Sequence, residues 1–240
     1  MKSILFRFLG VFSIIFILSA SIRCTSDGQA GPSKEELNLA QFKSYWDRGK
    51  AELTSYDLEQ ARYGEIHKGE AVMVFVTEPF SVSKQVKLDE PAMPKSDVVS
   101  VLKLNMTKKF ITGLYPYSMM LSAFTPVSVK TNPNTIKISA SSQEWCGHTF
   151  TQLNLQDDKS YVAKLFSYFE SEGDKEINIK AELLEDEVWA RLRIAPNDLP
   201  VGNLKVLPGA LYQRLRHIEL EPVEAKASLE KTELEDFPNE

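Results

Sequence analysis

Apolar residues recur at helical spacing in the segment 34–48, where they form a single stripe. The stripe consists of Leu39, Phe42, Tyr45 and Trp46. Ser33 just before the segment is a typical N-cap residue, and Gly49 just after it is a typical stop signal. We therefore expect a helix over 34–48.

The remainder of the chain up to residue 221 has a strand-like pattern of short apolar or alternating runs separated by turn residues. We expect strands at 72–76, 84–88, 98–106, 127–130, 135–141, 145–155, 161–169, 177–183, 188–194, 204–207 and 216–220. The acidic segment 222–240 either contains a short helix at 224–234 or frays. Many short strands with helix mainly at the ends indicate a mainly β fold: a large antiparallel sheet that forms an open barrel or a sandwich, with short N-terminal and C-terminal helices.

The first 23 residues have the pattern of an export signal. Lys2 and Arg7 make the start basic, and the apolar run that follows over 8–18 is short for a membrane span, which needs about 20 residues. Cys24 comes after small residues and precedes a polar spacer over 25–33. This order resembles a bacterial lipoprotein, which implies cleavage before Cys24 and anchoring through acyl chains such as palmitate.

Arg23 departs from the lipoprotein pattern, in which Gly, Ala or Ser usually precedes the cysteine. Two alternatives therefore stay open: cleavage by an ordinary signal peptidase after Ala20 or Ser21, and an uncleaved N-terminal anchor. In each case we expect the protein in the cell envelope, with its domain in the periplasm or at the outer membrane. If Cys24 is acylated, Cys146 has no partner for an internal disulfide.

The chain that remains after the leader has 217 residues, which suits one domain. We expect a signal peptide at 1–23, a flexible tether at 24–33, a β-rich domain at 34–221 and an acidic tail at 222–240. Without the leader, 25 basic residues stand against 33 acidic ones, a net charge of −8. This balance argues against nucleic acid as a partner, because phosphate binding needs a concentrated basic surface.

Candidate catalytic residues occur in the segment 141–150. If this segment is one strand, its side chains alternate, and Glu144, Cys146 and His148 share a face with Phe150. A thiol beside an imidazole and an acid is a nucleophile candidate, although nothing in the sequence identifies oxyanion donors. The alternative is that Cys146 and His148 are packed and hydrogen-bonded in the interior.

Aromatic residues and methionines are concentrated in the segment 110–124. The candidate ligand-binding residues are Tyr115, Tyr117, Met119, Met120 and Phe124. Methionine adapts to irregular apolar partners, so a barrel mouth lined in this way could accept a lipid or an apolar peptide. The alternative is a core strand followed by a turn.

Arginines alternate in two places, at Arg191 and Arg193 and again at Arg214 and Arg216. On a strand over 188–194, the first two share a face and could bind an anionic headgroup or a carboxylate. The alternative is a solvated face, on which the arginines pair with nearby carboxylates. Those carboxylates are Glu185, Glu187 and Glu219.

The sequence contains no nucleophile elbow, no Walker loop, no dinucleotide fingerprint and no H-E-x-x-H motif. A zinc site needs three or four ligands, and His67 and His217 lie far from His148 in the sequence. We therefore expect neither a cofactor nor a metal.

Several long motifs resemble a family of uncharacterised bacterial envelope lipoproteins whose members are often labelled "septum formation inhibitor Maf". The motifs are Tyr45-Trp46, 49–52, 59–64, 75–78, Leu104-Asn105, 108–110, 115–120 and 141–148. The nucleotide pyrophosphatases that share the label are cytoplasmic α/β proteins with an S-x-S-P-R-R-type signature, which this chain lacks, so the resemblance implies no such activity. At the level of the fold alone, the layout is similar to the open barrels of periplasmic lipoprotein carriers.

Together these patterns predict a membrane-anchored envelope lipoprotein that binds an apolar ligand or a protein partner without catalysis. One alternative is a thiol-dependent enzyme that uses Cys146 and His148. The other is a purely structural envelope protein.

Overall fold

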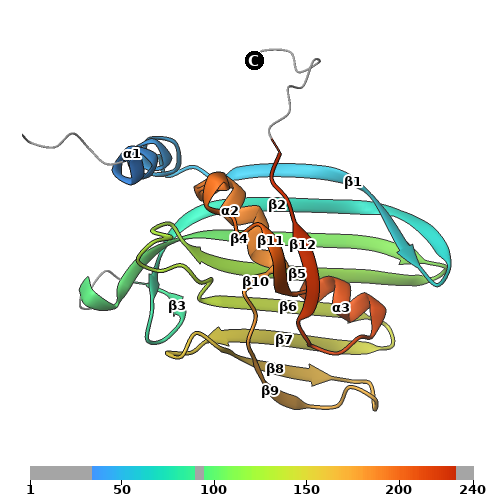
Figure 1. The fold of residues 1–240 in the computed structure, drawn as a ribbon. Coiled ribbons are helices and arrows are strands. Elements are labelled where there is room, and N and C mark those ends of the chain that lie inside the picture. The colour runs from blue at the N-terminus through green and yellow to red at the C-terminus, as the bar shows by residue number, and fades with distance from the viewer. Residues whose placement is uncertain (1–33, 90–94, 231–240) are drawn as a thin grey trace, which may run out of the picture.

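A large antiparallel sheet forms the body of the protein in the computed structural model, which describes residues 34–89 and 95–230 (Figure 1). In this part of the chain, nine strands follow the order β1-β2-β4-β5-β6-β7-β8-β9, with β3 paired to β2. The strands are β1 (Glu52–Arg62), β2 (Glu65–Ser81), β3 (Val86–Lys87), β4 (Val98–Thr112), β5 (Tyr115–Pro126), β6 (Lys137–Glu144), β7 (Gly147–Leu155), β8 (Tyr161–Ser167) and β9 (Lys175–Ile179). β1 and β9 end this order without pairing to each other, so the sheet is open, and the predicted mainly β fold is confirmed.

Side-chain alternation gives the sheet one strongly apolar face, which we call the inner face. Cross-strand partners form a continuous row on it, because each strand pairs in register with the next. The row consists of Phe75, Leu104, Ala123, Ile138, Leu153, Ala163 and Ile177, and all but the last are fully buried. The opposite, outer face alternates with it and is more polar.

A second layer, formed by residues 183–227, covers the inner face (Figure 1). Its elements are β10 (Leu183–Leu184), the 3-10 turn η2 (Glu185–Glu187), α2 (Val188–Ile194), the 3-10 turn η3 (Pro196–Asp198), β11 (Gly202–Leu207), α3 (Ala210–Arg216) and β12 (Val223–Ala227). β11 pairs with β10 in parallel and with β12 antiparallel, so this layer has a small sheet of its own. Buried side chains of α2 and α3 join the core of the large sheet, among them Ile194, Leu211 and Leu215.

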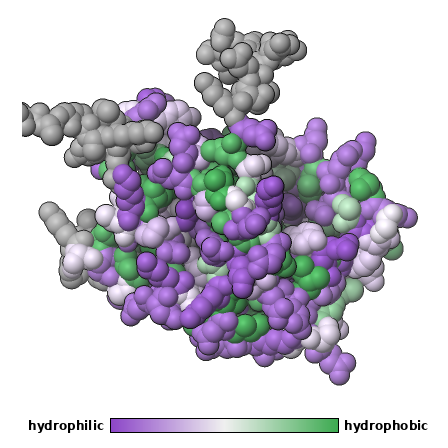
Figure 2. Space-filling model, viewed as in Figure 1, coloured by the Kyte–Doolittle hydropathy of each residue, from purple (hydrophilic) through white to green (hydrophobic). Residues whose placement is uncertain are grey.

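The predicted N-terminal helix is confirmed as α1 (Lys34–Trp46), with Phe42 and Trp46 buried in the main core. Figure 2 shows that the covered side of the molecule is mostly hydrophilic, with hydrophobic residues exposed near α1 and α2. Within residues 34–89 and 95–230, no helix is long and apolar enough to span a membrane.

The prediction of a strand at 188–194 is wrong, because this segment is the helix α2. Its apolar residues satisfy both periods: they alternate, and Ala190 and Ile194 also lie one helical turn apart on the buried side. Acidic residues at 185–187 precede the helix and Arg191 and Arg193 end it, an order of charges that favours a helix. The two arginines therefore do not share a face.

Three smaller predictions also fail. The segment 127–130 forms no strand, and 216–220 ends α3 and turns instead of closing the sheet. In the described part of the acidic segment, Val223–Ala227 form the strand β12 of the small sheet, so these residues neither fray nor begin the helix considered at 224–234. The signal peptide, the tether and Cys24 lie outside the described residues.

The acidic turn η2 holds the start of α3 against the sheet. The Glu185 carboxylate accepts a hydrogen bond from the backbone N–H of Gly209 at 2.8 Å, and the Asp186 carboxylate accepts one from Ala210 at 2.8 Å. Burial raises the pKa of Asp186 to about 7, and the neighbouring carboxylates add to this effect. Burial also lowers the pKa of Lys108, the base that faces this turn.

Replacement of Asp186 by Asn should flatten the dependence of stability on pH. The folded-state pKa of Asp186 lies above its ordinary value near 4, so its stabilising effect is fully present below pH 4 and is lost as the pH rises through about 7. We expect the free energy of unfolding of the native protein to fall by roughly 2–4 kcal/mol more than that of Asp186→Asn between pH 4 and 8. Urea denaturation across this range measures the difference. Asp57→Asn, at an exposed position of β1, is the control, and equal pH profiles for the native protein and Asp186→Asn would contradict the prediction.

Candidate functional site

The segment with the catalytic candidates is a hairpin turn and not one strand. Glu144 pairs with Gly147, so Trp145 and Cys146 form a two-residue loop between β6 and β7. The expectation that Glu144, Cys146 and His148 share a face is therefore wrong. The turn leaves Glu144 buried on the inner face, places the Cys146 thiol at the exposed tip, and directs His148 to the outer face.

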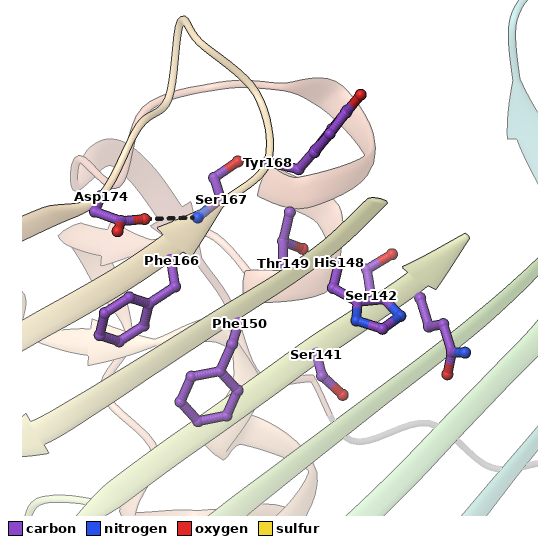
Figure 3. Close-up of a pocket in the computed structure, with 10 residues that line it drawn as sticks. Ser141, Ser142, His148, Thr149, Phe150, Phe166, Ser167, Tyr168 and Asp174 are labelled. Atoms are coloured by element: carbon purple, nitrogen blue, oxygen red, sulfur yellow. Dashed lines mark hydrogen bonds between the residues drawn. The ribbon is translucent and has the colours of Figure 1, made fainter. Parts of the chain in front are cut away.

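An open hollow of about 490 Å³ lies on the outer face beside this turn (Figure 3). Phe150 and Phe166 are cross-strand partners whose exposed rings lie side by side in it. Tyr168 packs directly on Gly147, where an added Cβ would lie 2.4 Å from the tyrosine ring, so only glycine fits there. The hollow thus offers exposed aromatic surface with His148 at its edge, which suits contact with a partner better than enclosure of a small molecule.

The five predicted ligand-binding residues do not line one surface, because β5 alternates between the two faces of the sheet. Tyr117 and Met119 are buried on the inner face, and the Tyr117 ring stacks on Phe110 with centroids 4.6 Å apart. Met120 is exposed on the outer face, where Phe124 stacks on Phe80, and Tyr115 lies at the β4–β5 turn. The segment is thus a core strand with a turn, which was the alternative interpretation.

A polar cluster occupies the inner face behind the β6–β7 turn. Arg214 of α3 lies 3.5 Å from the Glu144 carboxylate and 2.7 Å from that of Glu172, and its guanidinium stacks over Phe169 at 4.3 Å. His217, at the end of α3, lies 2.8 Å from Glu172. Arg214 therefore pairs with acids from two distant parts of the chain, and neither acid is among the partners that the sequence suggested.

Titration in this cluster reflects burial and charge together. Burial alone would raise the pKa of Glu172, but hydrogen bonds from Ser167 and His217 and the charge of Arg214 lower it. Burial and hydrogen bonds with Tyr63 and Glu144 raise the pKa of Tyr117 well above its usual value. The Tyr117 and Tyr63 hydroxyls lie 3.0 Å apart, so the cluster also holds the β1–β2 turn. Its groups are all paired within the protein, which is typical of a structural network.

Arg191 and Arg193 of α2 also bind carboxylates within the protein. Arg191 pairs with the buried Glu187 at 3.1 Å, as one interpretation of the sequence predicted. Arg193 donates to Glu52 of β1 at 3.0 Å through Nε, and its guanidinium lies 3.7 Å over the Phe75 ring. The contacts of Arg191 and Arg193 fasten α2 to the sheet. Arg216, the remaining arginine of the two alternating pairs, is exposed.

A larger groove of about 640 Å³, which sequence reasoning missed, lies between α1, the end of α2 and the loop after β5. Its apolar lining consists of Leu39, Phe42, Tyr45, Trp46, Val127, Val129, Leu192, Ile194, Ala195 and Pro196. The ion pair of Arg193 with Glu52 lies at its side. The apolar stripe on α1 was the one sign of this groove in the sequence. The opposite wall could not be predicted, because 188–194 was expected to be a strand and not a helix.

In residues 34–89 and 95–230, no group of three or more His, Cys, Asp or Glu side chains is arranged to hold a metal ion. Comparison of the chain with protein families, with curated proteins and with solved structures gives no match.

Alkylation of Cys146 tests the thiol-dependent alternative. The thiol is exposed, so iodoacetamide should modify it in the folded protein. A base that activates this thiol would be His148, but no hydrogen bond joins the two side chains within the described residues. We expect His148→Ala to change the alkylation rate at pH 7 by less than about twofold. Gln143→Ala, at the cross-strand partner of His148, is the control. A tenfold slower reaction of His148→Ala alone would instead favour the enzyme.

Proposed function

We propose that this protein is an envelope lipoprotein that binds an apolar, chain-like ligand in the groove between α1 and α2. The observation that carries the proposal is the groove itself, whose volume of about 640 Å³ falls in the range of small-molecule sites and whose walls are mainly aromatic and aliphatic. An acyl chain fits this lining, because its burial is favourable at every methylene and it needs few hydrogen bonds.

The place of the groove in the chain supports a ligand that comes from a membrane. Leu39 and Phe42 line the groove and belong to α1, which begins at residue 34, directly after the expected tether. Ten residues of extended chain, 24–33, reach at most about 35 Å. An anchor at Cys24 would therefore keep the groove close to the lipid surface from which an acyl chain can enter.

A protein partner is the second candidate, and the aromatic hollow on the outer face favours it. Phe150, Phe166 and Tyr168 are exposed there, and aromatic residues are enriched in protein interfaces. The thiol-dependent alternative has less support, because Glu144 is buried on one face while His148 is exposed on the other.

The groove is tested by Leu192→Glu. Leu192 lines the groove and is 39% exposed, so the replacement should leave the fold intact while it introduces a charge into the apolar wall. We expect the affinity for a fluorescent fatty acid to fall by about tenfold or more, since burial of a charge opposes binding. Leu114→Glu makes the same change at the exposed β4–β5 turn and should bind normally. Equal affinities of all three proteins would exclude the groove as the site.

Native mass spectrometry of residues 25–240, produced in a cell envelope, identifies the ligand class. A stoichiometric extra mass that organic extraction removes would support a lipid in the groove. A clean mass of the protein alone, together with a failed fatty-acid titration, would direct attention to a protein partner at the outer-face hollow.

The anchor is tested by Cys24→Ser. If Cys24 carries the lipid, its replacement should move the protein from the membrane fraction to the soluble fraction of fractionated cells, because acyl chains supply the membrane affinity. Cys146→Ser should leave the distribution unchanged. If Cys24→Ser instead stays membrane-bound with the leader uncleaved, the leader itself is the anchor.

A further inference from the structure

A third, smaller hollow lies under α3 and has a lining unlike that of the groove. This cleft has a volume of about 280 Å³ and is bounded by α3, by β7 to β9 and by the segment after α3. Its apolar walls include Leu165, Ile177 and Leu220, and Gln213 of α3 lies among them. It is separate from the groove at α1, since the two share no lining residue.

Gln213 is the unusual residue of this cleft. Its side chain is 3% exposed, and both Nε2 and Oε1 are buried without a hydrogen-bond partner in the described part of the chain. A buried amide that makes no hydrogen bond destabilises a fold, whereas an apolar side chain of the same shape would not. Arg214, the neighbouring residue of α3, is by contrast paired with Glu144 and Glu172. Gln213 is thus a lining residue of the cleft whose amide has no partner among the described residues.

The charges around the cleft define that group further. Glu172, Arg214 and His217 line the cleft but bind one another. The exposed charged residues of the lining, which mark its mouth, are Glu219, Glu221 and Lys175, so two carboxylates stand against one ammonium group there. The mouth thus favours a cationic ligand over an anionic one.

We propose that the cleft under α3 binds a small molecule that carries a carboxamide, an ammonium group and a short apolar side chain, as amino-acid amides do. The carboxamide pairs with Gln213, because in a cyclic pair each amide donates one N–H and accepts at its oxygen, which gives both Nε2 and Oε1 of Gln213 a partner. The apolar side chain contacts Leu165 and Ile177, and the ammonium group faces Glu219 and Glu221. Nothing in this site depends on the acyl-chain groove.

Three probes separate these contributions in titrations of the full chain, followed by NMR of its backbone amides. L-Leucinamide has all three groups, 3-methylbutylamine lacks the carboxamide, and N-acetyl-L-leucinamide lacks the positive charge. We expect saturable shifts in α3 and β8 with leucinamide, and affinities at least about tenfold lower for 3-methylbutylamine, which cannot pair with the amide. The acetylated probe should bind more weakly than leucinamide and should lose less affinity when salt is added.

Gln213→Met tests the role of the amide, since methionine keeps the shape and the helix propensity of glutamine. We expect it to lose at least about tenfold in leucinamide affinity while its melting temperature stays equal or rises. Gln143→Met makes the same change on the exposed outer face and should bind as the native protein does. Absence of leucinamide binding, equal binding by Gln213→Met, or a lower melting temperature of that variant would each overturn the proposal, the last because it would show that the amide is satisfied within the fold.

Discussion

The apolar row across the inner face is the constraint on which the rest of the molecule depends. Seven neighbouring strands, β2 and β4 to β9, each contribute one side chain to it, from Phe75 to Ile177, and a sheet with one such face must be covered. An antiparallel sheet that closes on itself covers its own interior, but this one stays open between β1 and β9. The layer of residues 183–227 therefore covers the apolar inner face that closure of the sheet would otherwise bury.

Ion pairs fix the covering layer at its two ends. Near β1, Arg193 binds Glu52 and stacks on Phe75, which holds α2. Behind the β6–β7 turn, Arg214 joins Glu144 to Glu172 and holds α3. Loss of one partner of the Arg214–Glu144 pair would destabilise the fold most, because both side chains have little solvent exposure and the other charge would be left buried.

The fold class could be predicted from the sequence because alternation over many short runs is a strong signal. A run as short as 188–194 is ambiguous, since Ala190 and Ile194 fit a helix while the alternating residues fit a strand, and its packing on the sheet decided between them. The turn at Trp145 and Cys146 was also hidden, because neither residue is a typical turn former. The partners of Arg214 and the unpaired amide of Gln213 depend on contacts between distant segments, which a single sequence does not specify.

The order of the elements along the chain has a consequence for its synthesis. All nine strands of the large sheet precede residue 180, whereas the layer that covers them follows it. A nascent chain that emerges from its N-terminus thus completes a broad apolar surface before its cover exists. Transiently exposed surfaces of this kind lead to aggregation, and chaperones protect them. Residues 183–227 can protect the apolar face only once they have been synthesised, so a truncated product that ends after β9 would leave that face exposed.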